Sequence, residues 1–195
     1  MVNLLAQCGD LEAYLGGSAV IDLDHAEVRS AHAAIVRDIR DPVALARSIY
    51  LFVRDEIRHS LDAGDTTVTL IASEVLRHRT GLCYAKSHLA AALYRLSGIP
   101  TGLCYQLVRS ESRLVLHGLV AVHLDGGWHR LDVRGNKPGV NAEFDLRQEE
   151  LAFHLDASLG ETDLPDLFSK PAPAIIQVLR SSDDIQQIEL PCRLG

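Results

Sequence analysis

The stretch Arg79–Pro100, RTGLCYAKSHLAAALYRLSGIP, predicts a helix and places a cysteine close to the start of that helix. Apolar residues recur here at the spacing of one helix face, at Leu82, Ala85, Leu89, Leu93 and Leu96. Gly98 and Pro100 end the helix, because glycine suits the position after a helix and proline cannot continue it.

Cys83 lies beside this apolar face, at a position that suits chemistry better than packing. With Thr80 as the expected N-cap, Cys83 falls at about the third helical position, where backbone N–H groups lack helical partners. The helix dipole favours a thiolate there, and the free N–H groups could hold an oxyanion. A buried core thiol and a zinc ligand are the alternatives, although no CxxC or HExxH spacing is present.

The residues before this stretch predict further helices. One is expected to begin at Asp24, with Glu27 three residues later as in a capping box, and to extend to about residue 40. The next begins at Asp41, a capping residue that is followed by proline. Residues 58–70 have no periodicity and are expected to form a loop, and a short helix is expected over about residues 73–78.

After Pro100 the apolar residues alternate, which predicts strands. Three strands are expected over residues 101–109, 113–124 and 127–133, with a further strand over residues 150–156. Residues 134–150 are expected to form a loop, and residues 174–180 fit either a helix or a strand. Helices followed by an antiparallel sheet indicate the α+β class.

The turn between the second and third strands determines which side chains share a sheet face. A two-residue turn at Asp125–Gly126 pairs Leu119 with Asp132, and His117 then lies diagonal to Asp132 on the same face. A three-residue turn would move Asp132 to the opposite face. Taken alone, His117 also fits a hydrogen-bonded histidine on a half-buried strand, and Asp132 fits a carboxylate in a surface ion pair. Together with Cys83, these two residues give the Cys–His–Asp order of an acyl-transfer site.

Two segments, TGLCYAKSHLAAALYRLSGIP at 80–100 and HGLVAVHLDGGWHRLDVRGN at 117–136, resemble the core of the transglutaminase-like superfamily. The resemblance covers about residues 45–135. It implies a papain-like fold, in which the helix that carries the cysteine packs on an antiparallel sheet. It also implies Cys83 as the nucleophile, His117 as general base and acid, and Asp132 as the residue that orients the imidazole.

The sequence departs from the family pattern at two places. Gly118 follows His117, where the family commonly has an aromatic residue, and Arg79–Thr80 occupy the place of a tryptophan that often precedes the G-x-C motif. The second oxyanion donor is left open, since Tyr84 and a side chain of the 58–70 loop are both candidates.

Composition limits the classes of function. The chain has 195 residues, expected to form a single domain over 1–195, and its net charge of -7 argues against nucleic-acid and anionic-membrane partners. Its four scattered cysteines and the lack of a recognisable signal peptide predict reduced thiols in the cytoplasm. No metal or organic cofactor is expected.

These observations predict thiol-dependent acyl transfer or hydrolysis at an amide or peptide bond, with Cys83, His117 and Asp132 as the catalytic residues. The partner is then a peptide or protein amide. Water as the acceptor would make the protein a cysteine peptidase or amidase, and an amine would make it a transferase; the sequence leaves both open. The alternative is a binding module that keeps the fold with an inert Cys83, because a fold alone does not determine a function.

Overall fold

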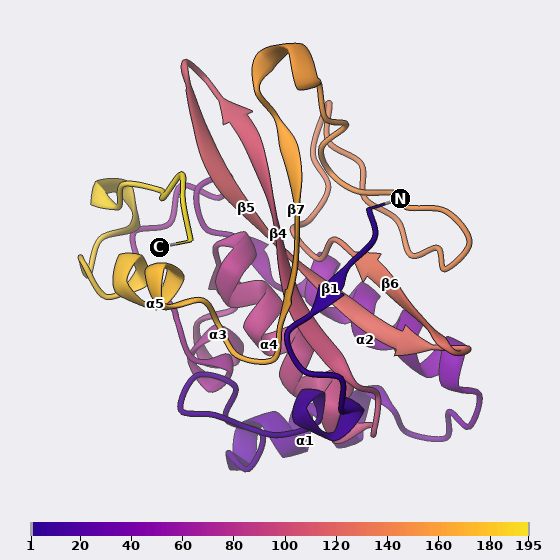
Figure 1. Ribbon diagram of the computed structural model, residues 1–195. Helices are drawn as coiled ribbons and strands as arrows, with labels where there is room; N and C mark the ends of the chain where they lie inside the picture. The colour runs from indigo at the N-terminus through magenta and orange to yellow at the C-terminus, as the bar shows by residue number, and fades with distance from the viewer. Residues whose placement is uncertain (1, 195) are drawn as a thin grey trace.

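The computed structural model describes residues 2–194, which form a mixed sheet with helices packed against it (Figure 1). The strands follow the spatial order β1 (Leu5–Ala6), β7 (Thr162–Phe168), β4 (Thr101–Ser110), β5 (Arg113–Leu124) and β6 (Gly127–Leu131). Neighbouring strands are antiparallel except the short β1, which runs parallel to β7. The expected α+β class, with an antiparallel sheet after the first helices, is confirmed.

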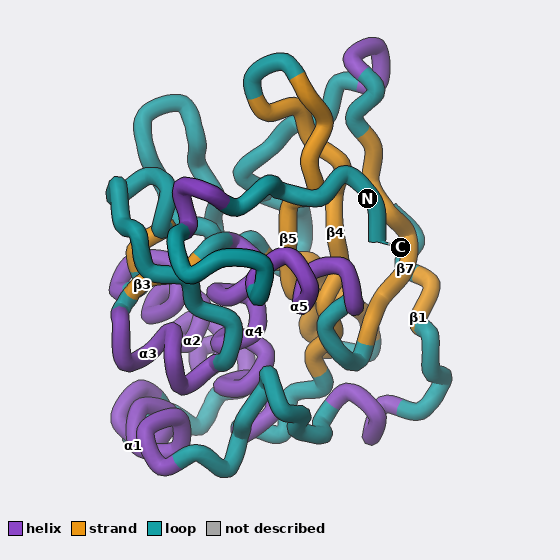
Figure 2. Tube along the Cα trace, turned by 90° about the vertical axis from the view of Figure 1, so that its left-hand side faces the viewer, coloured by secondary structure: helices purple, strands orange, loops and turns teal. Residues whose placement is uncertain are grey.

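The first four helices lie together on one side of the sheet, as Figure 2 shows. The helices are α1 (Ala26–Ile35), α2 (Pro42–Glu56), α3 (Ala72–His78), α4 (Cys83–Leu96) and α5 (Pro173–Leu179). Short 3-10 helices occur at Leu11–Tyr14, Ala157–Leu159 and Ile185–Gln187. Among these elements α4 is central, because it contacts α1, α2 and α3 as well as β4 and β5.

Helix α4 is buried on all sides, from Cys83 to Arg95. Its apolar stripe faces the core as predicted, but the flank that carries Lys86 and Ser87 is buried as well. The sheet covers one side of the helix and the other helices cover the rest. Polar groups on such a helix need partners inside the protein, which makes the contacts of Lys86 informative for the site.

The β5–β6 hairpin has the predicted two-residue turn, because Leu124 pairs with Gly127. The even-numbered residues from Leu116 to Leu124 lie on the face that α4 covers. The opposite face of β5 is also buried, in a smaller cluster that contains Tyr14, Cys104, Leu119, Ala121, Leu151 and Leu167. Burial of both faces explains why β5 is largely apolar, with Arg113, His117 and His123 as its polar residues.

The starts of α1 and α2 were predicted unequally well. Asp41 caps α2 as expected, since its carboxylate accepts a 2.7 Å hydrogen bond from a backbone N–H in the first turn. The expected cap at Asp24 is wrong, because His25 is the N-cap and its Nδ1 accepts a hydrogen bond from the Glu27 N–H. α1 also ends at Ile35, before the expected end near residue 40.

The strand expected over residues 150–156 is wrong. These residues form a loop, and the Ala152 N–H donates to the Asp132 side chain instead of to a strand neighbour. The sheet is extended by β7, which the sequence did not predict because Pro165 interrupts it, and proline normally argues against a strand. The ambiguous residues 174–180 belong mostly to α5.

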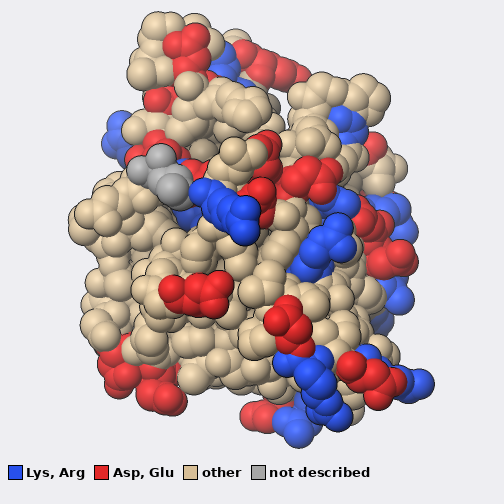
Figure 3. All heavy atoms as spheres, turned by 90° about the vertical axis from the view of Figure 1, so that its right-hand side faces the viewer, with Lys and Arg blue, Asp and Glu red and all other residues tan. Residues whose placement is uncertain are grey.

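Charged side chains are distributed over the surface. On the face shown in Figure 3, acidic and basic side chains are interspersed, and neither sign forms a continuous patch. Within residues 2–194, no helix has both the length and the apolar character required to cross a bilayer.

Candidate active site

Cys83 is the first residue of α4, and a small second sheet holds the chain just before it. In this sheet β3 (Thr80–Gly81) runs parallel to β2 (Arg58–His59). Leu82 is the N-cap, so the expectations that Thr80 caps the helix and that Cys83 is its third residue are wrong. The Thr80 hydroxyl donates instead to the Asp65 carboxylate, 2.5 Å away. Cys83 remains in the first turn, where backbone N–H groups lack helical acceptors.

Gly118 of β5 allows this first turn to lie directly against the sheet. A Cβ atom at position 118 would come within 2.8 Å of the Tyr84 ring and 3.3 Å of the Tyr84 backbone. The Gly118 N–H donates a 3.4 Å hydrogen bond to the Cys83 sulfur. The glycine in place of the family's common aromatic residue therefore makes room for Tyr84 and contacts the thiol.

His117 and Asp132 form a buried hydrogen-bonded pair. The Nε2 atom of His117 lies 2.8 Å from Oδ2 of Asp132, the residue that directly follows β6. The His117 ring also packs edge-on against the Phe153 ring, with 4.8 Å between centroids. Because Asp132 engages Nε2, Nδ1 is the ring nitrogen left for Cys83.

Three donors surround the Asp132 carboxylate, which has no exposed surface. Its Oδ1 accepts a hydrogen bond from the Arg134 N–H, and its Oδ2 accepts from the Ala152 N–H as well as from His117. Burial would raise the pKa of Asp132, but His117 and the two N–H groups lower it below its usual value. Asp132 is therefore an ionised carboxylate that is hydrogen-bonded to His117.

The electrostatics of His117 follow from this arrangement. Burial lowers the pKa of His117, but the charge of Asp132, the nearby Cys83 and hydrogen bonds to both outweigh it and raise the pKa to about 10. The site thus favours an imidazolium beside the sulfur of Cys83. This is the electrostatic arrangement that activates a thiol nucleophile.

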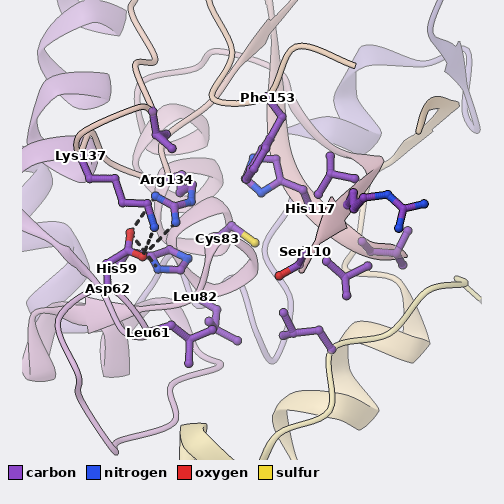
Figure 4. Close-up of a pocket in the computed structure, with 16 residues that line it drawn as sticks. His59, Leu61, Asp62, Leu82, Cys83, Ser110, His117, Arg134, Lys137 and Phe153 are labelled. Carbon is purple, nitrogen blue, oxygen red and sulfur yellow. Dashed lines mark hydrogen bonds and ion pairs between the residues drawn. The ribbon is translucent and has the colours of Figure 1, made fainter. Parts of the chain in front are cut away.

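Cys83 and His117 line a cavity of about 280 Å³ (Figure 4). Apolar side chains, including Leu61, Leu82 and Phe153, form much of its wall. Cys83 is 7% exposed, so its sulfur is reached through this cavity.

Four polar side chains form a charged cluster on one side of the cavity: His59, Asp62, Arg134 and Lys137. Asp62 accepts a 2.7 Å hydrogen bond from Lys137 Nζ and lies 2.8 Å from Arg134 Nη1. His59 Nδ1 lies 3.5 Å from Asp62, but burial and the charge of Arg134 lower the pKa of His59 to about 3, so His59 is neutral. The sequence did not predict this cluster, because His59 belongs to the short strand β2, the other three members lie in loops, and none of these segments has a hydrophobic periodicity.

Lys86, one turn after Cys83, is fully buried. Its ammonium donates hydrogen bonds to the carbonyl oxygens of Arg54, Ile57 and Arg134, at 3.2, 2.5 and 2.8 Å. These bonds join α4 to the end of α2 and to the segment after Asp132. Burial lowers the pKa of Lys86 to about 7, although the charge of Asp132 opposes this shift.

Tyr84 does not serve as a free oxyanion donor in this structure, since its hydroxyl donates to the Leu116 carbonyl. The backbone N–H of Cys83 lies at the start of α4, where the first intrahelical bond runs from the Lys86 N–H to the Leu82 carbonyl. Backbone N–H groups in such a first turn can stabilise an oxyanion. Within residues 58–70, His59 is a neutral side chain with hydrogen-bonding groups that lines the cavity with Cys83.

All four cysteines of the chain are free thiols. Cys104 is completely buried in β4, and burial raises its pKa to about 12, as suits a core thiol. Cys192 is exposed and Cys8 is partly buried. In the described part of the chain, no group of three or more His, Cys, Asp or Glu side chains is arranged to hold a metal ion.

The fold and this geometry agree with a family comparison. The model of the transglutaminase-like superfamily matches residues 29–133, and the chain belongs to this superfamily. The matched region contains all three residues singled out from the sequence, and the structure brings these residues together. None of the curated proteins matches the chain in sequence.

Several solved structures are similar to parts of this chain at low sequence identity. One, from Cytophaga hutchinsonii and named a "Putative Cysteine Protease", has a TM-score of 0.56 and 19% identity over 65% of this chain and 43% of its own. The periplasmic domain of TgpA from Pseudomonas aeruginosa has a TM-score of 0.48 and 19% identity over 62% and 46%. A protein named a TGase has a TM-score of 0.46 and 15% identity over 91% and 52%. The chain thus spans about half or less of each of these proteins.

Proposed function

We propose that the protein catalyses thiol-dependent acyl transfer or hydrolysis at an amide or peptide bond, with Cys83 as the nucleophile. The observation that carries the proposal is the position of His117. It is hydrogen-bonded to the buried carboxylate of Asp132 and lines the same cavity as Cys83. A thiol, an imidazole and an orienting carboxylate are the groups that this chemistry requires.

In the first half of the proposed reaction, the Cys83 sulfur attacks the carbonyl carbon and forms a carbon–sulfur bond. The N–H of Cys83 faces the developing oxyanion. His117 then gives its proton to the leaving nitrogen as the carbon–nitrogen bond breaks, which leaves an acyl thioester on Cys83. Asp132 keeps Nε2 of His117 engaged, so that Nδ1 carries the transferred proton.

In the second half, His117 removes a proton from the acceptor as the acceptor attacks the thioester. The carbon–sulfur bond breaks and the thiolate is restored. Water as acceptor gives a peptidase or amidase, and an amine gives a transferase.

The test is to trap the acyl-enzyme. The protein is mixed with p-nitrophenyl acetate and with N-acetyl peptide anilides, and intact mass and peptide mapping locate any acyl group. We expect acylation at Cys83 that decays with water or faster with added primary amines, and that Cys83→Ala and His117→Ala both lack. Acylation at another residue, or equal acylation in His117→Ala, would contradict the proposal.

We also propose that the protein works in a reducing compartment such as the cytoplasm. The support is the set of four free thiols, one of which lies in the site. Denatured, unreduced protein isolated from its native cell should yield all four thiols in a thiol count. Two fewer would indicate a disulfide and would overturn the assignment.

A further inference from the structure

The cavity beside Cys83 carries an excess of positive charge, although the whole chain has a net charge of -7. Its wall contains three cationic side chains, Arg109, Arg134 and Lys137, and a single carboxylate, Asp62. His59 adds no charge, because it is neutral. The excess is therefore two positive charges beside the Cys83–His117 pair. A cleft of one sign in a protein of the opposite sign attracts ligands of the opposite charge.

Asp62 cannot neutralise both of the cations that it contacts. Its Oδ1 accepts hydrogen bonds from Arg134 at 3.1 Å and from Lys137 at 2.7 Å, and its Oδ2 forms an ion pair with Nη1 of Arg134 at 2.8 Å. With both oxygens occupied, Asp62 is unsuited to binding a cationic substrate. Its role in the charged cluster is to hold Arg134 and Lys137 in place.

Lys137 is the cation of this cluster that remains available to a ligand. The Arg134 side chain is 7% exposed and directs both terminal nitrogens at Asp62, whereas the Lys137 side chain is 42% exposed. An ammonium group has three donors, and among the described residues Asp62 is the sole acceptor of the Lys137 side chain. Two donors of Lys137, a residue that lines the cavity, are therefore free for a ligand.

The chain places Lys137 in a fixed relation to the candidate active site. Asp132, Arg134 and Lys137 lie within six consecutive residues, and the Arg134 N–H donates to Asp132. The guanidinium of Arg134 also lies over the Phe153 ring that packs against His117. Figure 4 shows the charged cluster on one side of Cys83 and shows His117 and Phe153 on the other side.

We propose that the acyl donor carries a carboxylate group that Lys137 binds, with Arg134 and Asp62 holding Lys137 in position. The substrate class is an acidic peptide or amide, whose apolar part packs against Leu61, Leu82 and Phe153. This inference rests on the proposed function for the presence of a scissile carbonyl. The recognition of the carboxylate itself does not depend on turnover.

The first experiment measures peptide binding to Cys83→Ala, which lacks the nucleophile. The probes are acetylated tetra-alanine amide and its single-glutamate and single-glutamine derivatives at each position. We expect at least one glutamate peptide to bind about threefold to fivefold tighter than its glutamine isostere, as suits a partly exposed ion pair. The preference should decrease at high salt.

The matched controls use two of the three lysines of the chain, Lys137 and Lys170. Adding Lys137→Met should reduce the glutamate-to-glutamine ratio to about one, whereas Lys170→Met, which removes the same charge at an exposed residue outside the cavity, should leave the ratio unchanged. Equal binding of glutamate and glutamine peptides, no measurable binding of any glutamate peptide, or a preference that survives Lys137→Met would overturn the inference.

A second measurement uses two alkylating reagents of similar size that differ in charge, iodoacetate and iodoacetamide. Peptide mapping gives the rate of each at Cys83 in the protein with its thiol intact. The iodoacetate-to-iodoacetamide ratio should decrease about threefold to fivefold in Lys137→Met and stay constant in Lys170→Met and Lys137→Arg. An unchanged ratio in Lys137→Met would contradict an anion site at Lys137.

The two proposals fail differently. Preferential binding of glutamate peptides without acylation of Cys83 by any donor would contradict the proposed function and leave the carboxylate site standing. Acylation of Cys83 with equal rates for acidic and neutral donors would contradict the carboxylate site and leave the proposed function standing.

Discussion

The imidazole of His117 and the carboxylate of Asp132 lie 2.8 Å apart because the two-residue turn at Asp125–Gly126 aligns β5 with the end of β6. Asp132 has no exposed surface, and its other contacts come from the N–H groups of Arg134 and Ala152. The pair therefore belongs to the framework of the fold. We expect a substitution of either residue to lower the reactivity of Cys83 while the strand pairing of the sheet persists.

Asp132→Asn should reduce the rate of acylation at Cys83 on the order of a hundredfold or more, because the tautomer and orientation of His117 are no longer enforced. Acylation by p-nitrophenyl acetate, followed by intact mass, measures the rate. Circular dichroism and a melting curve establish that the fold persists. A rate within a few fold of wild type in a folded variant would remove Asp132 from the site.

The pH dependence of acylation should reflect the raised pKa of His117. The imidazolium beside Cys83 persists up to a pKa of about 10, so the rate should decrease as pH rises through that value. Asp132 is one cause of the raised pKa, so Asp132→Asn should move the alkaline decrease to lower pH. If the rate decreased at the same alkaline pH in wild type and in Asp132→Asn, Asp132 would not be a cause of the raised pKa of His117.

Lys86 and His117 should have opposite effects on stability between about pH 7 and pH 10. The pKa of Lys86 is lowered to about 7, so above this pH the folded chain holds fewer protons than the unfolded chain, and the Lys86 contribution to the free energy of unfolding rises with pH. The pKa of His117 is raised to about 10, so the His117 contribution is complete below its usual pKa and is lost as pH rises through 10.

Urea unfolding across this pH range tests these opposite contributions of Lys86 and His117 to the free energy of unfolding. In Lys86→Met the free energy of unfolding should decrease with rising pH more steeply than in wild type, and in His117→Gln it should decrease less steeply or rise. Parallel curves for wild type and Lys86→Met would mean that Lys86 is not perturbed by its burial.

Gly118→Ala should destabilise the protein by about 1–3 kcal/mol, because the added Cβ would meet the Tyr84 ring at 2.8 Å and overpack the start of α4. Gly127→Ala is the matched control in the neighbouring strand, since a Cβ there would meet only His129, at 3.7 Å. Urea unfolding gives both values. Equal stability of the two variants would refute the close approach of α4 at Gly118.

The central elements were predictable because their signals are periodic. Helical spacing predicted α4, alternation predicted β4 to β6, and the Asp125–Gly126 turn predicted the register that joins His117 to Asp132. The elements that were missed lack such a signal: β7 contains Pro165, and β1 has only two residues. Neither segment has a hydrophobic periodicity from which its strand pairing could be predicted.

The charged cluster could not be predicted from the sequence for a different reason. His59 ends β2 and Asp62 follows it closely, whereas Arg134 and Lys137 lie in the loop after β6, and only the folded chain brings these two segments to the same cavity. The N-cap at Leu82 was missed because the two residues expected to start the helix form β3 instead. Thr80 is a good capping residue by type, but its hydroxyl is engaged by Asp65.

The comparison of two cysteines tests the central claim, that Cys83 is the nucleophile, most directly. Cys104 is buried in β4, so Cys104→Ala should cost about 1 kcal/mol of stability and leave acylation unchanged. The measurement is acylation of wild type, Cys83→Ala and Cys104→Ala by p-nitrophenyl acetate, read by intact mass at matched folded fractions. If Cys83 is the nucleophile, we expect an acyl adduct on wild type and on Cys104→Ala and none on Cys83→Ala. An adduct on Cys83→Ala that is absent from Cys104→Ala would contradict it.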